Sequence, residues 1–330
     1  MHLDLLVPTF NRRHLLEGTL RSIARAERPL HLAIRVVVVN NDASRDIPGI
    51  ETLLAELPYP AAVLHEPAPG KSSALNTAVS ASSADYIGLI DDDEQIDGRW
   101  FRVVEEALAG GDLDFVGGRS LAIWDTPPPG WLPRDYPAVL GITDMGPHRR
   151  LYGPDAPGIL CGGNAVIARP ALHRIGLFCS SLGPRLNRRL LSCEDEDLYW
   201  RLLDSGARGL YVPELIVHHR MHRDRLTRRY HRAWAFWNGA SKAVLGHRRP
   251  SPLPKIAGVP RYLYGEALRG MVRLARLAFT PGAAAERVSA ELTLWHLAGH
   301  LYGHHLPERA AGTRIAPASP VGLRGDVAAL

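Results

Sequence analysis

The first third of the chain alternates short apolar runs with stretches in which apolar residues recur at helical spacing. A short apolar run bounded by polar residues is typical of a buried strand, and spacings of three and four residues are typical of an amphipathic helix. The expected strands span residues 3–8, 33–40, 61–66 and 86–91. The expected helices span residues 13–26, 47–57, 72–82 and about 98–110. This rhythm predicts an α/β domain with a mostly parallel sheet flanked by helices, whose ligands bind at the carboxyl ends of the strands.

The pattern becomes less regular after residue 120. Residues 120–160 are rich in Gly and Pro, and we expect them to form ordered loops near the site. Regular structure is expected again as helices at 169–175 and 194–205 and as a strand at 209–219. Beyond about residue 225 the pattern is helical and rich in Arg.

Within that last part, the segment 261–279 carries two chemically different helical faces. One face holds Leu268, Val272, Ala275 and Phe279. Another holds Arg269, Arg273 and Arg276. A basic amphipathic helix that is too short and too charged to span a bilayer is typical of a segment lying on a membrane surface. The alternative is that this helix packs on the main domain or on another subunit.

Composition and charge add little to this picture. Hydrophobic residues make up 46% of the 330 residues and charged residues 22%, as in ordinary globular proteins. The net charge of +5 is modest, but Arg residues crowd into 185–189, 220–232 and 248–276. This asymmetry suits an anionic partner such as a diphosphate, a phospholipid surface or nucleic acid, unless the Arg residues are simply solvated. Three cysteines without a CxxC pair argue against a disulfide framework. Because no signal peptide and no bilayer-spanning run is present, we expect a cytoplasmic protein that contacts the inner face of the membrane at most peripherally.

Two runs of acidic residues carry the candidate chemistry: Asp91–Glu94 after an expected strand, and Glu194–Asp197 at the start of an expected helix. Consecutive acids beside a buried strand repel one another unless a cation neutralises them. A divalent ion completed by substrate phosphates, Mg²⁺ or Mn²⁺, suits the first run. Asp195 in the second run is a candidate general base. Each run is also explained by the preference of acids for the N-terminus of a helix.

Six short motifs extend these clusters: PTFNR at 8–12, NNDAS at 40–44 followed by Asp46, GKSSALN at 70–76, IDDDE at 90–94 followed by Trp100, CEDEDLYWRL at 193–202, and VPELIVHH at 212–219. In this order they resemble the family 2 glycosyltransferases of the GT-A fold, over about residues 1–240. Each motif alone is weak, and their joint order carries the resemblance. It implies an inverting transferase that moves a sugar from a nucleotide diphosphate donor, with UDP as the expected nucleotide. The acceptor would be a hydroxyl of a glycan or a lipid-linked glycan.

The resemblance also implies roles for individual residues. The donor would be bound by Pro8, Thr9, Asn11, Arg12, Asp42, Lys71, Asn76, Asp91 and Asp92. A divalent metal ion, Mn²⁺ or Mg²⁺, would be held by Asp93 and His219, with His218 as a close neighbour. Asp195 would be the catalytic base, with Glu194 beside it. Because this chain has Asn41-Asp42 where the family has two acids or Asp-Asn, the partner of each of these two residues is open.

The expected organisation follows from the motifs. A GT-A catalytic domain spans 1–225, with a nucleotide-sugar half at about 1–120 and an acceptor half at about 120–225. A helical, Arg-rich extension spans 226–310, and a disordered tail spans 311–330.

Three smaller features each allow two interpretations. One helical face carries three histidines: His296, His300 and His304. They form a metal site or, as we favour, a surface or interface stripe. The loop Cys161–Asn164 either lies beside the sugars or is a simple turn, and Trp124 and Trp131 either stack on sugar or anchor their loop.

Two rival functions are disfavoured. A sugar nucleotidyltransferase would have a Gly-rich, Arg-containing loop after the first strand, where this chain has PTFNRR. A non-catalytic binding module of the same fold would not need both acidic runs intact. An acidic pocket also repels a nucleic acid backbone, and we expect no nucleic acid partner.

Overall fold

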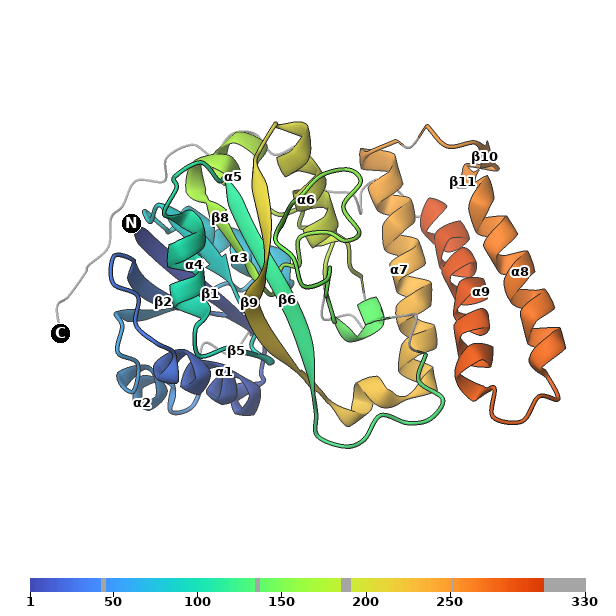
Figure 1. Cartoon of the computed structure of the whole chain (residues 1–330), viewed down its shortest axis with the longest axis horizontal. Helices are drawn as coiled ribbons and strands as arrows, with labels where there is room; N and C mark the ends of the chain where they lie inside the picture. The colour runs from blue at the N-terminus through green and yellow to red at the C-terminus, as the bar shows by residue number, and fades with distance from the viewer. Residues whose placement is uncertain (43–45, 134–136, 185–190, 251, 306–330) are drawn as a thin grey trace.

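The computed structural model describes residues 1–42, 46–133, 137–184, 191–250 and 252–305. Within these residues, the body of the protein is built on a nine-stranded mixed sheet (Figure 1). The strand order is β3-β2-β1-β4-β8-β6-β9-β5, and β7 pairs with β9.

The N-terminal half of the sheet is parallel. Its strands, in spatial order, are β3 (Ala61–His65), β2 (Ala33–Asn40), β1 (His2–Thr9) and β4 (Tyr86–Leu89). Helices cover both faces, so the strands are apolar on both sides, which explains their continuous apolar runs. One face packs against α1 (Arg13–Arg25), α2 (Ile50–Ala55) and α4 (Trp100–Leu108). The other packs against α3 (Lys71–Ser80), α5 (Arg169–Ile175) and α6 (Glu194–Asp204).

The second half of the sheet is mixed. Strand β8 (Ala165–Ala168) runs antiparallel between β4 and β6 (Phe115–Trp124). The long strand β9 (Gly209–Met221) is parallel to β6 and antiparallel to two short strands, β5 (Glu94–Ile96) and β7 (Arg150–Leu151). The parallel arrangement expected from the sequence therefore describes the first half, and antiparallel strands complete the sheet.

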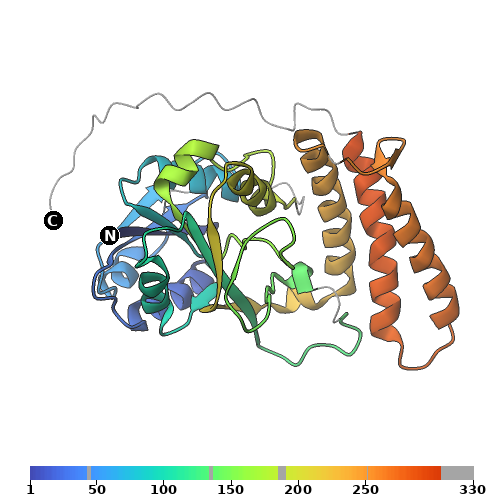
Figure 2. The same ribbon diagram turned by 45° about the horizontal axis from the view of Figure 1, so that its top comes forward.

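The C-terminal part is helical, as the sequence predicts. Within the described residues it comprises one 3-10 turn and three helices with a small hairpin: η2 (Arg223–Leu226), α7 (Arg228–Arg248), β10 (Lys255–Ile256), β11 (Val259–Pro260), α8 (Arg261–Leu277) and α9 (Ala284–His304). A second 3-10 turn, η1 (Pro137–Leu140), lies earlier in the chain, between β6 and β7. Both Figure 1 and Figure 2 show α9 between α7 and α8. Helices α7 and α9 pack so closely that a Cβ at Gly299 would collide with the backbone oxygen of Phe236. No helix in the described residues is long and apolar enough to cross a membrane. The predicted disordered tail at 311–330, like residues 306–310, lies outside the described residues.

The histidine face of α9 lies against α7. His300 is buried, and its Nδ1 lies 3.3 Å from the backbone oxygen of Gly239. His304 contacts His247 of α7, with 3.2 Å between their ring nitrogens. Among the described residues, no group of three or more His, Cys, Asp or Glu side chains is arranged to hold a metal ion by itself. The geometry thus favours an interface stripe, formed within this chain.

Candidate active site

A cavity of about 980 Å³ lies at the carboxyl ends of β1 and β4. Its walls come from the loop after β1, the first turns of α3 and α6, the segment 138–143 and one face of α7. Parallel strands end at the same edge of a sheet, so motifs far apart in the sequence converge there. Ten of the predicted site residues line this cavity: Pro8, Thr9, Asn11, Arg12, Lys71, Asp91, Asp93, Glu194, Asp195 and His219.

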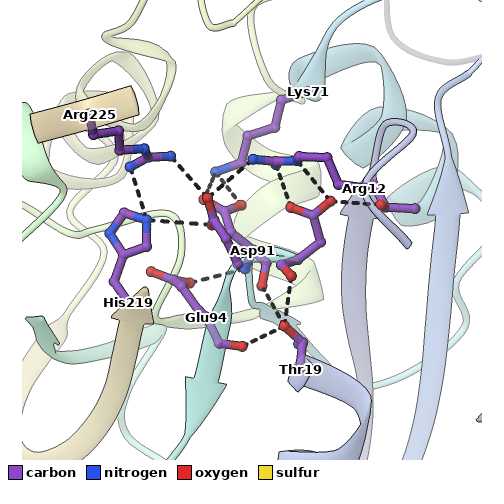
Figure 3. A network of polar contacts seen from close by, with 10 residues as sticks. Arg12, Thr19, Lys71, Asp91, Glu94, His219 and Arg225 are labelled. Carbon is purple, nitrogen blue, oxygen red and sulfur yellow. Dashed lines mark hydrogen bonds and ion pairs between the residues drawn. The ribbon is translucent and has the colours of Figure 1, made fainter. Parts of the chain in front are cut away.

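The first acidic run forms the turn between β4 and β5, and α1 holds it from below (Figure 3). The Thr19 hydroxyl donates to the backbone oxygen of Glu94 at 2.6 Å. The carboxylate of Glu94 in turn accepts the backbone N–H of Asp91 at 3.0 Å. Glu94 is buried, and this burial raises the pKa of its carboxyl well above the ordinary value. The turn is therefore fixed from inside, and its other carboxylates project from a rigid base.

Asp92 is fully buried and lies outside the cavity lining. The Thr9 hydroxyl donates to its carboxylate at 2.6 Å, and Arg12 Nε donates to the same oxygen at 3.2 Å. Burial raises the pKa of Asp92 to about 7, although the neighbouring charge of Arg12 opposes the rise. Asp92 thus holds in place the side chains of Thr9 and Arg12, which do line the cavity.

Asp93 is buried, and three basic side chains converge on its carboxylate. Its carboxylate accepts from Arg12 at 3.1 Å and from Arg225 at 2.9 Å, and lies 3.5 Å from His219 Nε2. His219 stands there because β5 and β9 pair Glu94 with His219. Burial alone would raise the pKa of Asp93, but the bond to His219 and the charges of Arg225 and Arg12 hold it below its usual range. Asp93 is therefore an anion that already attracts cations.

Lys71 stands between the two acidic runs. It begins α3, and its ammonium lies 2.6 Å from a carboxylate oxygen of Asp91. Burial opposes its charge, but Asp91, Asp195 and Glu194 together raise the pKa of Lys71 well above the ordinary value. A permanent positive charge therefore faces both runs from one wall of the cavity.

Asp195 lies in the first turn of α6. Its Oδ2 accepts the backbone N–H of Gly162 at 3.0 Å. A side chain at Gly162 would collide with this carboxylate, so the loop must have glycine there. The other oxygen, Oδ1, is buried and has no hydrogen-bond partner within the described part of the chain. Burial raises the pKa of Asp195, and Lys71 opposes the rise.

Glu194 precedes Asp195 in the same turn and is also buried. Burial, with the nearby charge of Asp195, raises the pKa of Glu194 to about 8. At neutral pH Glu194 is therefore mostly protonated, because its ionised form would be buried beside the charge of Asp195.

Three of the residues predicted to bind the sugar donor do not line the cavity: Asp42, Asn76 and Asp92. The side-chain amide of Asn76 donates to the backbone oxygen of Phe178 at 2.9 Å and accepts its N–H at 2.8 Å. It therefore ties α3 to the segment after α5. Asp42 follows β2, and its backbone oxygen lies 2.8 Å from His65 Nε2. Its neighbour Asn41 does line the cavity, and accepts the N–H of Gly70 at 2.8 Å, which places the start of α3.

Sequence reasoning missed Arg225. This residue lies on η2, and its guanidinium donates to His219 Nε2 at 3.0 Å as well as to Asp93. No motif contains it, and the only signal is its place in an Arg-rich stretch that follows His219 by a few residues. It was therefore indistinguishable from the surface arginines around it.

The loop Cys161–Asn164 combines both of its interpretations. Asn164 is buried, accepts from Trp100 Nε1 at 2.9 Å and donates to the backbone oxygens of Arg119 and Leu215. Cys161 and Gly163 line the cavity. The buried amide therefore anchors a loop whose other side faces the site.

The two tryptophans of the Pro-rich region differ in their surroundings. Trp131 packs edge-to-face on His231 and lies under the guanidinium of Arg228, which favours the anchoring interpretation. Trp124 ends β6 and is partly exposed.

The donor set of the cavity fits a divalent cation. Asp93 Oδ1 and His219 Nε2 are 3.5 Å apart. Two ligands at about 2.1 Å from one ion lie roughly 3.0–3.5 Å from each other, which matches. Arg225 donates to His219 Nε2, so the lone pair of that nitrogen is held by Arg225, and a metal ion at Nε2 would have to displace this contact. Two protein ligands suffice only where substrate phosphates complete the shell, as is common for Mg²⁺.

Comparison with known proteins bears on this site. The family model described as Glycosyl transferase family 2 matches residues 4–176. The chain is similar to the succinoglycan biosynthesis protein ExoM of Rhizobium meliloti, with 30% identity over 66% of this chain and 66% of that protein. It is also similar to the pre-mycofactocin glycosyltransferase of Mycobacterium tuberculosis, with 26% identity over 79% of this chain. The chain spans just under two thirds of the first relative and 51% of the second.

Two solved structures share its fold. The mannosyltransferase PcManGT from Pyrobaculum calidifontis, solved in complex with GDP-Man and Mn²⁺, aligns with a TM-score of 0.55 at 19% identity. That alignment covers 91% of this chain and 86% of the other. TarS 1-349 of S. aureus, solved in complex with UDP, aligns with a TM-score of 0.51 at 14% identity, over 92% of this chain and 89% of the other.

Proposed function

The chain belongs to glycosyltransferase family 2 and has the GT-A fold that its sequence predicted, and on this premise we propose that it is an inverting, metal-dependent sugar transferase. The donor is a nucleotide diphosphate sugar, with UDP as the first candidate nucleotide. The acceptor is a hydroxyl of a glycan or of a lipid-linked glycan. One observation carries the proposal: a single cavity holds two carboxylate groups in different electrostatic states, with Lys71 between them.

The first acidic run provides the end of the cavity that suits a diphosphate. Arg12, Lys71 and Arg225 all reach it, and each is paired with an aspartate of the run. Cations placed in this way can bind phosphate oxygens by charge-assisted hydrogen bonds. Asp93 and His219 would hold Mn²⁺ or Mg²⁺, and the bound ion would neutralise charge on the leaving diphosphate.

The second run provides the base. Asp195 takes the proton from the acceptor hydroxyl as the acceptor oxygen attacks the anomeric carbon and the bond to the diphosphate breaks. The N–H of Gly162 orients one carboxylate oxygen, which leaves Oδ1 to receive the proton. A single displacement from the side opposite the leaving group inverts the anomeric configuration. Lys71 favours the ionised form of Asp195 that this role requires.

The test is a panel of UDP- and GDP-sugars incubated with the protein, with Mn²⁺ and with EDTA, and assayed for donor hydrolysis. We expect one donor to be hydrolysed slowly in Mn²⁺ and not in EDTA. Binding of a nucleotide sugar without any turnover would instead indicate a non-catalytic protein of the same fold. Turnover that is equal in EDTA would refute the metal site.

We also propose that α8 contacts an anionic membrane surface. Leu268, Val272 and Phe279 are exposed, although the sequence places them on one apolar face, and Arg269 and Arg273 are exposed beside them. Apolar side chains flanked by arginines suit the boundary between lipid headgroups and acyl chains. Flotation with anionic vesicles should recover the protein and Phe279→Asp should reduce that recovery. Equal recovery with neutral vesicles would contradict the proposal.

A further inference from the structure

Helix α7 has two faces with different neighbours. One face is buried against α9 and carries small or buried residues at every fourth position: His231, Ala235, Gly239 and Ala243. The adjacent face carries Tyr230, Trp234, Asn238 and Lys242, also at every fourth position. All four of these side chains line the active-site cavity. We call them the α7 stripe.

The α7 stripe is tied to the base end of the cavity. The Asn238 amide donates to the Ser192 hydroxyl at 3.1 Å. The Lys242 ammonium lies 2.6 Å from the carboxylate of Glu196. Ser192 and Glu196 flank Asp195 closely in sequence, so the Asn238 and Lys242 end of the stripe lies beside the residue proposed as the base. The rings of Tyr230 and Trp234 line the cavity further along α7, where they also pack against the apolar cluster of Val139, Leu140 and Met221. The arginines that suit a diphosphate lie instead at the other acidic run.

The chemistry of the α7 stripe suits an uncharged sugar. Two aromatic rings offer apolar faces, on which the C–H face of a pyranose can pack. The Asn238 side chain and the neighbouring carboxylates offer partners for sugar hydroxyls. The charge of Lys242 is already balanced by Glu196, and both Glu194 and Asp195 lie close by. An anionic ligand would meet repulsion there, whereas a neutral sugar would not.

We propose that the α7 stripe is the acceptor subsite and that it binds a neutral pyranose of the acceptor with its hydroxyl toward Asp195. This inference rests on the proposed function, because it presumes that Asp195 activates an acceptor. It also changes the expected domain boundary. The catalytic unit does not end at residue 225 but includes α7 at least as far as Lys242.

The test compares Trp234→Ala and Trp234→Phe with a matched control, Trp295→Ala. Trp295 is a partly exposed indole on α9 that does not line the cavity. Each protein is titrated with p-nitrophenyl β-glucoside, β-galactoside and β-glucuronide by calorimetry, with and without the nucleotide diphosphate that the donor panel identifies. Octyl β-glucoside and octyl β-galactoside, below their micelle concentrations, distinguish a lipid-linked source of the sugar from a free one.

We expect the wild-type protein to bind at least one neutral glycoside and to bind the glucuronide more weakly. Removal of a central aromatic anchor should weaken glycoside binding about tenfold or more in Trp234→Ala. Trp234→Phe should recover part of that loss, and Trp295→Ala should bind like the wild type. Donor hydrolysis and nucleotide affinity should stay within about twofold in Trp295→Ala, because Trp295 does not line the cavity. In the two Trp234 variants, glycoside binding should weaken more than nucleotide binding.

Several results would overturn the inference: no neutral glycoside binds the wild type, the glucuronide binds best, or Trp234→Ala binds glycosides normally. Loss of nucleotide binding in Trp234→Ala would also overturn it, because the side chains of the stripe would then only support the fold of the cavity. A different result would contradict the proposed function, namely a wild-type protein that hydrolyses no nucleotide sugar. Tighter binding of the octyl glycosides would support a lipid-linked acceptor, and equal binding would support recognition of the sugar alone.

Discussion

The two acidic runs have nearly the same composition but opposite surroundings. Asp91–Glu94 is neutralised on its cavity side by three cations from three different elements. In Glu194–Asp197 the cations bind the last two members instead. Lys242 pairs with Glu196, and Arg201 and Arg248 pair with Asp197. Asp195, in the middle, has one backbone donor and an unpaired oxygen among the described residues.

This difference teaches what each run can do. Carboxylates that hold exchangeable cations form a site where a metal ion and a diphosphate can replace the arginine contacts. A carboxylate that is buried, oriented and in no direct ion pair can accept a proton. Lys71 links the two, because the charges of both runs act on it. The comparison therefore predicts that substitutions in the two runs will fail in different ways.

The largest effect is expected for Asp195→Asn. Asparagine keeps the size and the hydrogen bond from Gly162 but cannot take a proton, so kcat for transfer should fall by about 10²–10⁴. The affinity for the nucleotide diphosphate and for Mn²⁺ should be unchanged, because those ligands belong to the other run. The measurements are steady-state transfer and calorimetric titration of nucleotide. A variant that keeps full transfer, or that loses nucleotide binding, would remove the distinction between the runs.

Arg225→Ala should change the binding of the two ligands of the first run, Mn²⁺ and the nucleotide diphosphate, in opposite directions. Without nucleotide, removal of a cation that occupies Asp93 and His219 should strengthen Mn²⁺ binding. With nucleotide, loss of a charge-assisted bond to phosphate should weaken binding of the diphosphate by about tenfold. Electron paramagnetic resonance of free Mn²⁺ measures the first effect and calorimetry measures the second.

Arg223→Ala is the matched control for this prediction, because Arg223 is an exposed arginine in the same 3-10 turn. Arg223→Ala should change neither the affinity for Mn²⁺ nor the affinity for the nucleotide diphosphate. Weaker binding of both ligands in Arg225→Ala would mean that Arg225 only supports the fold of the site.

Much of this fold follows from local patterns, and most of the failures have a common cause. The first four strands and their helices are set by apolar runs and helical spacing, so their positions agree with the structure to within a few residues. Strands β5 and β7 were missed because they contain three and two residues, too few for any periodicity. They exist because the long strand β9 offers them backbone partners. Such pairing is tertiary information. The ten-residue strand β6 was also missed, because Gly117 and Gly118 interrupt its apolar run and its last residues lie in the segment 120–160 that was expected to form loops.

The site residues also divide into those that local sequence patterns predict and those that depend on tertiary folding. Residues at strand ends, such as Thr9 and Asp91, could be predicted because topology brings those ends together. Arg225 and the α7 stripe could not, because their place depends on how η2 and α7 fold back over the cavity. Asn76 matched a motif, yet its amide is used by the backbone of Phe178. A motif reports which residue type is present but not which way its side chain points.

Glu194→Gln should have a smaller effect that depends on pH. Because the pKa of Glu194 is raised to about 8, its carboxyl is mostly protonated at neutral pH, and glutamine imitates that neutral form. We expect kcat at pH 7 to stay within a few-fold, of the order of one lost hydrogen bond. Because this carboxyl keeps its proton in the folded protein up to about pH 8 but ionises near pH 4.5 in the unfolded chain, the Tm of the wild type should fall as the pH rises between these values. The Tm of the variant should fall less over the same range. An equal fall in both proteins would contradict the assignment.

The smallest effect is expected for Arg248→Ala, which tests the outer, structural side of the second run. Arg248 Nε lies 3.2 Å from Asp197 Oδ1, and about a third of the Arg248 side chain is exposed. Asp197 keeps its second partner, Arg201, at 2.8 Å, so no buried charge is left unpaired. A partly exposed ion pair contributes at most about 1 kcal/mol, and Tm should therefore fall by about 1–3 °C. Transfer kinetics and nucleotide affinity should match the wild type. If Arg248→Ala changed either of them, the ion pairs of Asp197 would also serve the cavity, and the contrast between the two runs would be lost.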